Sequence, residues 1–124
     1  MGRTDDSTTR LRLRLVFGDQ GMLGPGKADL LELIAETGSI AAAGRRIGMS
    51  YRRAWTLVET MNAIFRAPLV ISTRGGAAGG GARLTEDGAR VLALYRQFET
   101  KARKAGGDEI AAIEEMLTAT DSQT

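Results

Sequence analysis

Residues 39–65 carry two helical patterns separated by a three-residue turn, and this spacing restricts the fold more than any other part of the chain. Ser39 precedes the first pattern, which runs to Ile47, and Ser50 precedes the second. A serine in either position can accept a hydrogen bond from a free amide in the first turn of a helix. Gly48 between them supplies a bend in which a positive φ costs little. We therefore expect two short helices that pack closely across a tight turn.

The second of these helices, predicted over 51–65, has one apolar and one polar face. Its apolar residues recur at steps of three and four, which is the spacing of a buried stripe on a helix. This stripe consists of Ala54, Leu57, Val58, Met61 and Phe65. The opposite face holds Arg52, Thr56 and Glu59, and the two shoulders hold Arg53 and Trp55. The outward face of this helix is therefore polar and begins with arginine.

The segment after these helices has the pattern of a β-hairpin. Pro68 ends helical structure, and the apolar, β-branched sequence LVIST that follows it favours a strand. Residues 75–81, GGAAGGG, cannot hold regular structure, and residues 82–84 resume a short strand. The hairpin thus has a long glycine-rich tip flanked by Arg74 and Arg83. Two helices joined by a tight turn and followed by a hairpin are typical of a winged helix-turn-helix.

Two further elements are predicted before this motif. The alternation of leucine and arginine in RLRLRLVFG predicts a strand over 11–17, with one buried and one charged face. The following DQGMLGPG, residues 19–26, is typical of a turn. Apolar residues at helical spacing then predict a helix over 27–37, with Pro25 near its start and a glycine directly after its end.

A long helix is predicted after the hairpin. It opens at Thr85 and extends to about Lys104, where Gly106 and Gly107 interrupt it. Asp108 can cap a final short helix. The expected fold class is therefore mainly α with a small β-hairpin, in the form of a winged helix-turn-helix with a long carboxy-terminal helix.

We expect the chain to form one such domain. Its winged helix-turn-helix covers residues 10–85, and the carboxy-terminal helices, assigned to dimerisation, cover 86–119. Residues 1–9 and 120–124 are polar, lack periodicity and are predicted to be disordered tails.

The positive charge of the chain is concentrated in residues 39–85. This segment holds seven arginines, one acid and no lysine, so it carries +6 by count, against −1 for residues 1–38 and −3 for 86–124. The three values sum to the formal +2 of the whole chain. Such a basic segment is typical of a surface that binds a polyanion, most simply nucleic acid. The alternative is a solvated arginine-rich surface.

Arginine is well suited to reading DNA from this fold. In a helix-turn-helix the second helix enters the major groove, and residues near its amino end contact the bases. The planar fork of Arg52 or Arg53 can donate two hydrogen bonds to guanine. Arg74 and Arg83 on the wing are expected to contact phosphates. The predicted DNA-binding residues are Ser39, Arg45, Arg46, Ser50, Tyr51, Arg52, Arg53, Thr56, Arg74 and Arg83.

Several of these features also have a purely structural interpretation. Trp55 can stack on the DNA backbone, but a single tryptophan on a helix shoulder is more often a core or interface anchor. The Tyr51 side chain can equally donate to a phosphate or cover the edge of the core. Arg45 and Arg46 end their helix, where cations also suit the helix dipole. The glycine-rich tip lacks the Lys-Ser or Lys-Thr of a nucleotide-binding loop.

Composition excludes most other function classes. The chain has no cysteine and no histidine, so it lacks thiolate metal ligands, cysteine nucleophiles and the commonest general base. We expect no catalytic residues, no metal and no cofactor. Apolar runs are too short for a membrane span, and the polar start lacks the apolar region of a signal peptide. A soluble, cytoplasmic protein is the resulting expectation.

Residues 38–62, GSIAAAGRRIGMSYRRAWTLVETMN, together with PLV and GGAAGGGARLTEDGARVLALY, resemble a known family. They are similar to the amino-terminal DNA-binding domain of the ModE-type molybdate-responsive regulators, which is related to the LysR-type helix-turn-helix. The resemblance covers roughly residues 10–104 and implies binding of operator DNA by a dimer. In that family carboxy-terminal domains bind the oxyanion, and no SARNQ-like oxyanion segment is found here. We therefore expect a DNA-binding domain without the oxyanion domain, whose small-molecule effector is unknown.

The long carboxy-terminal helix is predicted to form a homodimer. Its apolar stripe is too long to be covered fully by so small a domain, and two-fold symmetry suits paired DNA half-sites. The predicted interface residues are Val91, Leu92, Tyr95 and Phe98. The sequence thus favours a dimeric, sequence-specific transcriptional regulator that binds double-stranded DNA. The alternative is a winged-helix interaction module that binds an acidic protein partner.

Overall fold

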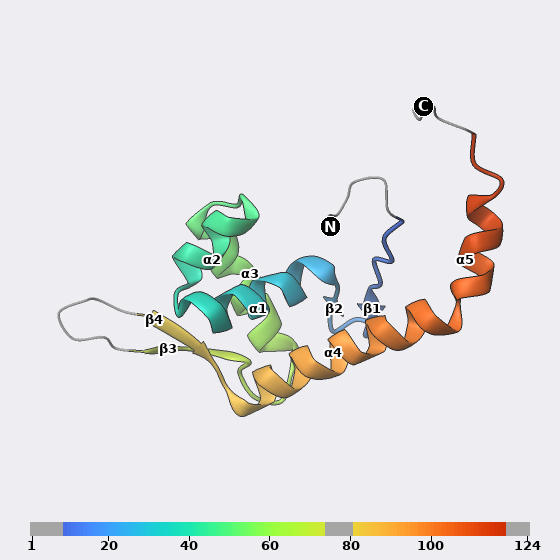
Figure 1. Ribbon diagram of the computed structural model, residues 1–124. Helices are drawn as coiled ribbons and strands as arrows, with labels where there is room; N and C mark the ends of the chain where they lie inside the picture. The colour runs from blue at the N-terminus through green and yellow to red at the C-terminus, as the bar shows by residue number, and fades with distance from the viewer. Residues whose placement is uncertain (1–8, 74–80, 119–124) are drawn as a thin grey trace.

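The computed structural model describes residues 9–73 and 81–118. Its helices are α1 (Pro25–Thr37), α2 (Ile40–Ile47), α3 (Tyr51–Ile64), α4 (Glu86–Ala105) and α5 (Gly107–Glu114). Its strands are β1 (Leu15–Val16), β2 (Met22–Leu23), β3 (Val70–Thr73) and β4 (Gly81–Leu84). In Figure 1 the β3–β4 wing extends from one side of the α1–α3 body, and α4 runs along that body toward α5 at the other end. This arrangement is the winged helix-turn-helix predicted from the sequence.

Both predicted serine caps are present in the helix-turn-helix. The Ser39 hydroxyl oxygen accepts a hydrogen bond from the Ala42 amide at 3.0 Å, and that of Ser50 accepts from the Arg53 amide at 3.1 Å. Gly48 ends α2 in the left-handed region with a φ of 87°. The turn therefore has the chemistry that its sequence indicated.

The crossing of α2 and α3 depends on small residues. A Cβ atom at Gly44 would lie 3.0 Å from the Cβ of Ala54, so these two helices approach almost to backbone contact. The core beneath them is formed by apolar residues from α1, α2, α3 and the wing. Its buried members are Leu30, Leu31, Ile34, Ile40, Ala43, Ala54, Val58, Met61, Leu69, Val70 and Ala82.

The base of the wing is fastened to α3 by one side chain, Asn62. Its Oδ1 accepts hydrogen bonds from the Leu69 amide at 2.8 Å and the Val70 amide at 3.2 Å. Its Nδ2 donates to the Val70 carbonyl at 3.0 Å. On the other strand, the Ala82 amide donates to the Gly38 carbonyl at 2.9 Å. The wing is thus attached to the last part of α3 and to the connection between α1 and α2.

Strands β3 and β4 pair antiparallel, with Val70 opposite Leu84 and Thr73 opposite Gly81. The chain then enters α4 at Thr85, whose hydroxyl donates to the Pro68 carbonyl at 2.7 Å and accepts from the Gly88 amide at 3.0 Å. A Cβ atom at Gly88 would overlap the carbonyl oxygen of Leu69. Glycine is therefore required where the first turn of α4 meets the wing.

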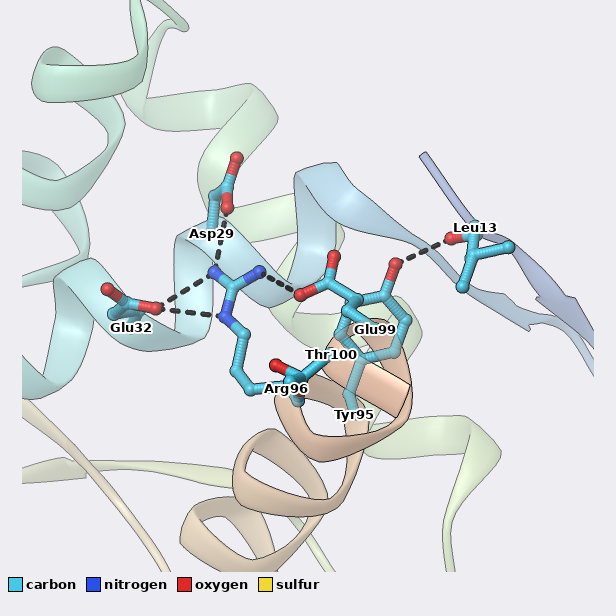
Figure 2. Close-up of polar contacts among 7 residues, drawn as sticks. All are labelled: Leu13, Asp29, Glu32, Tyr95, Arg96, Glu99 and Thr100. Atoms are coloured by element: carbon cyan, nitrogen blue, oxygen red, sulfur yellow. Dashed lines mark hydrogen bonds and ion pairs between the residues drawn. The ribbon is translucent and has the colours of Figure 1, made fainter. Parts of the chain in front are cut away.

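Helix α4 is held on the body by a buried tyrosine and a cluster of charges (Figure 2). Tyr95 is 2% exposed, and its hydroxyl donates to the Leu13 carbonyl. The Arg96 guanidinium contacts Asp29 and Glu32 of α1 at 2.8 Å each, and Glu99 at 3.0 Å. Partial burial acts to lower the pKa of Arg96, but these hydrogen bonds outweigh it, so the pKa is raised. Arg96 thus stays charged and ties α4 to α1.

The predicted strand over 11–17 is wrong in length. Only Leu15 and Val16 pair with a partner strand, β2, which lies inside the segment predicted to be a turn. The predicted alternation itself is present: Leu11 and Leu13 are half-buried and the arginines between and after them are exposed. After the short turn that follows Phe17, only Met22 and Leu23 return alongside the segment. Its first part is therefore extended but has no partner strand.

Other element boundaries differ slightly from the prediction. Helix α5 begins after Gly106, which offers no capping side chain, so the predicted Asp108 cap is wrong and this residue lies in the first turn. Helix α3 ends one residue before Phe65. Residues 1–8 and 119–124, which contain nearly all of the predicted tails, lie outside the described residues.

Candidate nucleic-acid interface

The amino end of α3 presents free arginine side chains to solvent. Arg52, Arg53 and Thr56 are all exposed, and neither arginine forms an ion pair with any residue in 9–73 or 81–118. The buried positions of α3 are Ala54, Val58 and Met61. The polar face that the helical spacing predicted is therefore turned outward, and its guanidinium donors are available to a ligand.

A hollow of about 310 Å³ lies beside this face. It is bordered by the start of α2, the start of α3 and the tip-side ends of β3 and β4, and its lining consists of Ser39, Ile40, Ala41, Tyr51, Trp55, Ser72 and Gly81. The rings of Tyr51 and Trp55 stack with centroids 6.4 Å apart and planes 18° apart. Tyr51 is 58% exposed, whereas Trp55 is half-buried and packs against the core. Trp55 thus anchors the wall of the hollow.

The start of α2 contributes backbone donors to this hollow. Only the Ala42 amide is used by the Ser39 cap, and the first amides of a helix have no intrahelical acceptor. No acidic side chain lies in the first turn of α2. The hollow therefore combines free amides, the positive end of a helix dipole and three hydroxyl groups, those of Ser39, Tyr51 and Ser72, which suit an anion.

The remaining predicted contacts are distributed between the end of α2 and the wing. Arg45 is exposed, whereas Arg46 forms an ion pair with Glu36 of α1 at 3.3 Å. Both partners of this pair are more than half exposed, so it adds little to stability. Arg83 is exposed on β4. Arg74 lies outside the described residues.

One arginine of the basic segment is engaged elsewhere. Arg66, near the end of α3, contacts Asp87 of α4 through two nitrogens, at 3.1 and 3.4 Å. These hydrogen bonds raise the pKa of Arg66 and lower the pKa of the Asp87 carboxyl. The charge of residues 39–85 is thus not gathered on a single face, contrary to what the count of charges alone suggests.

The residues predicted for a dimer interface do not share one environment. Tyr95 is buried within its own chain beneath the N-terminal segment, so in this conformation it offers almost no surface to a second copy. Val91 and Leu92 are half-buried and pack against the core. Phe98 is 40% exposed, and Leu94, which was not among the predicted interface residues, is 48% exposed. The open apolar surface of α4 is therefore smaller and lies on a neighbouring face.

Sequence reasoning missed two positioning residues. Asn62 orients the wing, and Arg96 orients α4, yet each stands in the sequence as an ordinary polar residue on a helix. A polar residue on the edge of the apolar stripe of α3 is the only local signal for Asn62. The acids that contact Arg96 on α1 are 64 and 67 residues away in the chain, which no local pattern reveals.

Within residues 9–73 and 81–118, no group of three histidine, cysteine or acidic side chains is placed to hold a metal ion. No helix in the same ranges has the length and apolar character to cross a membrane.

Residues 27–89 match the family described as bacterial regulatory helix-turn-helix proteins of the lysR family. Similar curated proteins include the molybdenum-pterin-binding protein MopB of Rhodobacter capsulatus, 44% identical over 82 residues, with 66% of this chain and 30% of that protein covered. The molybdenum transport protein ModE of Azotobacter vinelandii is 42% identical over 76 residues, covering 61% and 28%. The ModE regulator of Haemophilus influenzae is 34% identical over 115 residues, covering 90% and 45%.

The chain spans about a third of the length of the first two of these relatives. A solved structure described as the CbnR_DBD-DNA complex matches with a TM-score of 0.56 and 24% identity. The match covers 71% of this chain and 95% of the solved one, so the two share the same fold over nearly the whole solved domain.

Proposed function

Because the chain belongs to the lysR family of bacterial regulatory helix-turn-helix proteins, a family of transcription factors rather than enzymes, we propose that it is a sequence-specific transcriptional regulator that binds operator DNA. The observation that carries this proposal is the amino end of α3, where Arg52, Arg53 and Thr56 are exposed and the two arginines are unpaired within the described ranges. In this proposal α3 enters the major groove. Arg52, which points directly away from the core, donates two hydrogen bonds to a guanine.

The hollow beside α3 receives a phosphate of the DNA backbone. Free amides at the start of α2 and the exposed Tyr51 hydroxyl are donors that fit a phosphate oxygen. Ser39 and Ser50 act mainly as caps that hold the two helices in register, while their hydroxyl hydrogens remain able to donate. Phosphate contacts of this kind position the protein and leave base recognition to the arginines.

The wing and the end of α2 supply further positive charge. Arg83, Arg45 and, once its weak pair with Glu36 opens, Arg46 contact phosphates on either side of α3. Arg74 is assigned the same role from its place in the sequence. The solved domain of the same fold is described as a complex with DNA, which supports DNA as the ligand.

We also propose that the regulator controls molybdenum-related genes and that it is a homodimer. The first assignment is based on relatives named molybdenum transport protein ModE and molybdenum-pterin-binding protein MopB. The second is based on the open apolar stripe of α4, formed by Leu94 and Phe98. An antiparallel pair of α4 helices covers this stripe and presents two α3 helices to paired half-sites.

Selection of bound sequences from a random duplex library tests the proposal. We expect enrichment of a palindromic motif, with an affinity that falls steeply as salt rises. Enrichment of a single half-site would retain DNA recognition but reject the dimer. Absence of any enriched motif, with tight capture of an acidic protein, would instead support the interaction module.

A further inference from the structure

Two apolar surfaces of this chain are left without a partner in the described residues. One is a groove of about 340 Å³ between the end of α3 and the start of α4, whose apolar walls are Ile64, Phe65, Leu69, Val91 and Leu94. The other is the face of α5 and the turn after it, where Ile113, Met116 and Leu117 are 62%, 84% and 65% exposed. We propose that α5 of a second copy of this chain docks in this groove, and this rests on the α4 dimer proposed above.

Charge complementarity favours this pairing. The groove is rimmed by Arg66, Arg90 and Asp87, of which Arg66 and Asp87 pair with each other. Arg90 forms no ion pair with any described residue, so the rim has a net positive charge. Residues 106–118 contain four acids and no basic residue. The acidic helix therefore matches the free charge beside the groove.

The distribution of apolar and acidic side chains around α5 also fits the groove and its rim. At about 100° per residue, Ile110, Ile113 and Leu117 fall within one stripe about 60° wide, since the turn after α5 continues the helical hydrogen bonds. Glu114 and Glu109 flank this stripe on opposite sides, whereas Glu115 lies on the far face. An apolar stripe bordered by acids can insert into an apolar groove and place its carboxylates near the rim.

The placement follows from the direction of α4. Asp87, Leu94, Phe98 and Ala105 lie within roughly 40° of one another around α4, so the groove and the open Leu94–Phe98 surface form one continuous stripe. An antiparallel pair centred on Phe98 places the end of the second α4 beside Val91. The second α5 begins two residues later and thus reaches the groove.

The chain cannot fill this groove with its own α5. From Leu94 to Ala105 the helix continues for 11 residues, a rise of about 17 Å away from the groove. In Figure 1 α5 accordingly lies at the end of α4 remote from the wing. A reciprocal exchange, in which each copy covers the groove of the other, closes the interface by two-fold symmetry.

Disulfide trapping tests the contact, and the chain has no cysteine to cause background. The test variant carries Arg90→Cys on the groove rim and Ile110→Cys on the apolar stripe of α5, and the control carries Arg90→Cys with Ala111→Cys, on another face of α5. Arg90 and Ala111 are exposed and Ile110 is only partly buried, so these changes should disturb the folded chain little. After mild oxidation we expect a covalent dimer on a denaturing gel for the test variant and little for the control. Equal yields from the two variants would overturn the proposal, as would a compact cross-linked monomer.

Charge reversal gives an independent readout of the same contact. Glu114→Arg and Arg90→Glu should each weaken the dimer roughly threefold or more, and the double variant should recover it. Glu115→Arg is the matched control and should leave the dimer unchanged. Sedimentation of the wild-type chain separates the two proposals: a wild-type monomer rejects the α4 dimer itself, whereas a stable dimer without the Arg90–Ile110 cross-link rejects only the docking of α5.

Discussion

At the scale of single residues, local exposure and pairing divide the arginines into different roles. Arg52 and Arg53 are exposed and unpaired within the described ranges, whereas Arg66 is held by Asp87 and Arg96 is surrounded by three carboxylates. An arginine whose donors are already satisfied must lose those hydrogen bonds before it can bind DNA. The free arginines of α3 are therefore better placed for base recognition than the paired ones.

Replacement of Arg52 tests its assignment to a base. Arg52→Ala should weaken binding to the selected operator by roughly 1–3 kcal/mol and binding to random duplexes much less. Competition titrations with both duplexes measure the two losses. The control is Arg103→Ala, an exposed arginine on α4 far from α3. Equal losses on operator and random DNA would make Arg52 a phosphate contact and leave Arg53 or Thr56 as the base reader.

Among the glycines that the structure describes, Gly88 is the one at which a side chain has least room. Because a Cβ atom there overlaps the Leu69 carbonyl oxygen, Gly88→Ala must push α4 away from the wing. We expect a loss of about 1–3 kcal/mol in the free energy of unfolding, measured by urea titration. Gly107→Ala, where a Cβ atom meets nothing within 4 Å, is the control and should be neutral or slightly stabilising. A Gly88→Ala variant as stable as the wild type would show that α4 can shift at its start without cost.

At the scale of elements, the wing and α4 are positioned by polar side chains at their bases. Asn62 accepts hydrogen bonds from the backbone amides at the start of β3, and Arg96 joins α4 to α1. Each contact links segments that local sequence leaves independent. The geometry of the DNA-binding surface therefore depends on residues that do not touch DNA.

Loss of the Asn62 amide should loosen the wing. Asn62→Ala leaves the amides of Leu69 and Val70 without their side-chain acceptor, so we expect about 1–3 kcal/mol less stability toward urea. Hydrogen exchange at those two amides should accelerate more than exchange in α1. Thr60→Ala, on the exposed part of the same helix, is the control. Unchanged exchange at β3 would contradict the role given to Asn62.

The wing arginines should act through charge rather than base recognition. Replacing both Arg74 and Arg83 by alanine is expected to weaken binding to all duplexes alike, because residues 75–82 are glycine and alanine and cannot read base edges. The slope of log affinity against log salt should fall by about 0.9 for each phosphate that the wing no longer neutralises. Binding measured across a salt series decides this. An unchanged slope would mean that the wing is a solvated loop.

At the scale of the whole molecule, α4 packs against the helical body on one side and exposes apolar side chains to solvent on another. Tyr95 and Arg96 face α1 and the N-terminal segment, while Leu94 and Phe98 face solvent. An exposed apolar stripe that continues into a groove is typical of an interface. Dimerisation and DNA recognition are therefore expected to depend on opposite ends of the same fold.

A charge on the open stripe should separate dimerisation from folding. Phe98→Lys is expected to leave the helical content unchanged but to shift the chain toward monomer in sedimentation at micromolar concentration. Binding to two half-sites about 34 Å apart should weaken, while binding to one half-site persists. Gln97→Lys, on an adjacent exposed face, is the control. A Phe98→Lys variant that remains dimeric would place the interface elsewhere.

The sequence by itself determined the local features of this protein. Serine caps, glycine turns and apolar spacing were sufficient to predict α2, α3, the hairpin and the outward face of α3, because these features depend on residues within one or two turns of each other. The free arginines at the start of α3 follow from the same periodicity. The family resemblance then added an expectation of function that no single motif supplied.

Only the tertiary structure decided which surfaces remain open. Tyr95 has the spacing of an exposed stripe, yet the segment around Leu13 covers it, and the first part of the arginine-leucine segment lacks a partner strand. In the sequence Arg66 and Arg96 count simply as positive charges. In the structure each is paired with acids on another helix, Arg66 with Asp87 of α4 and Arg96 with Asp29 of α1. Burial and ion pairing depend on contacts between residues far apart in the chain, so they were settled only when the helices and the wing packed together.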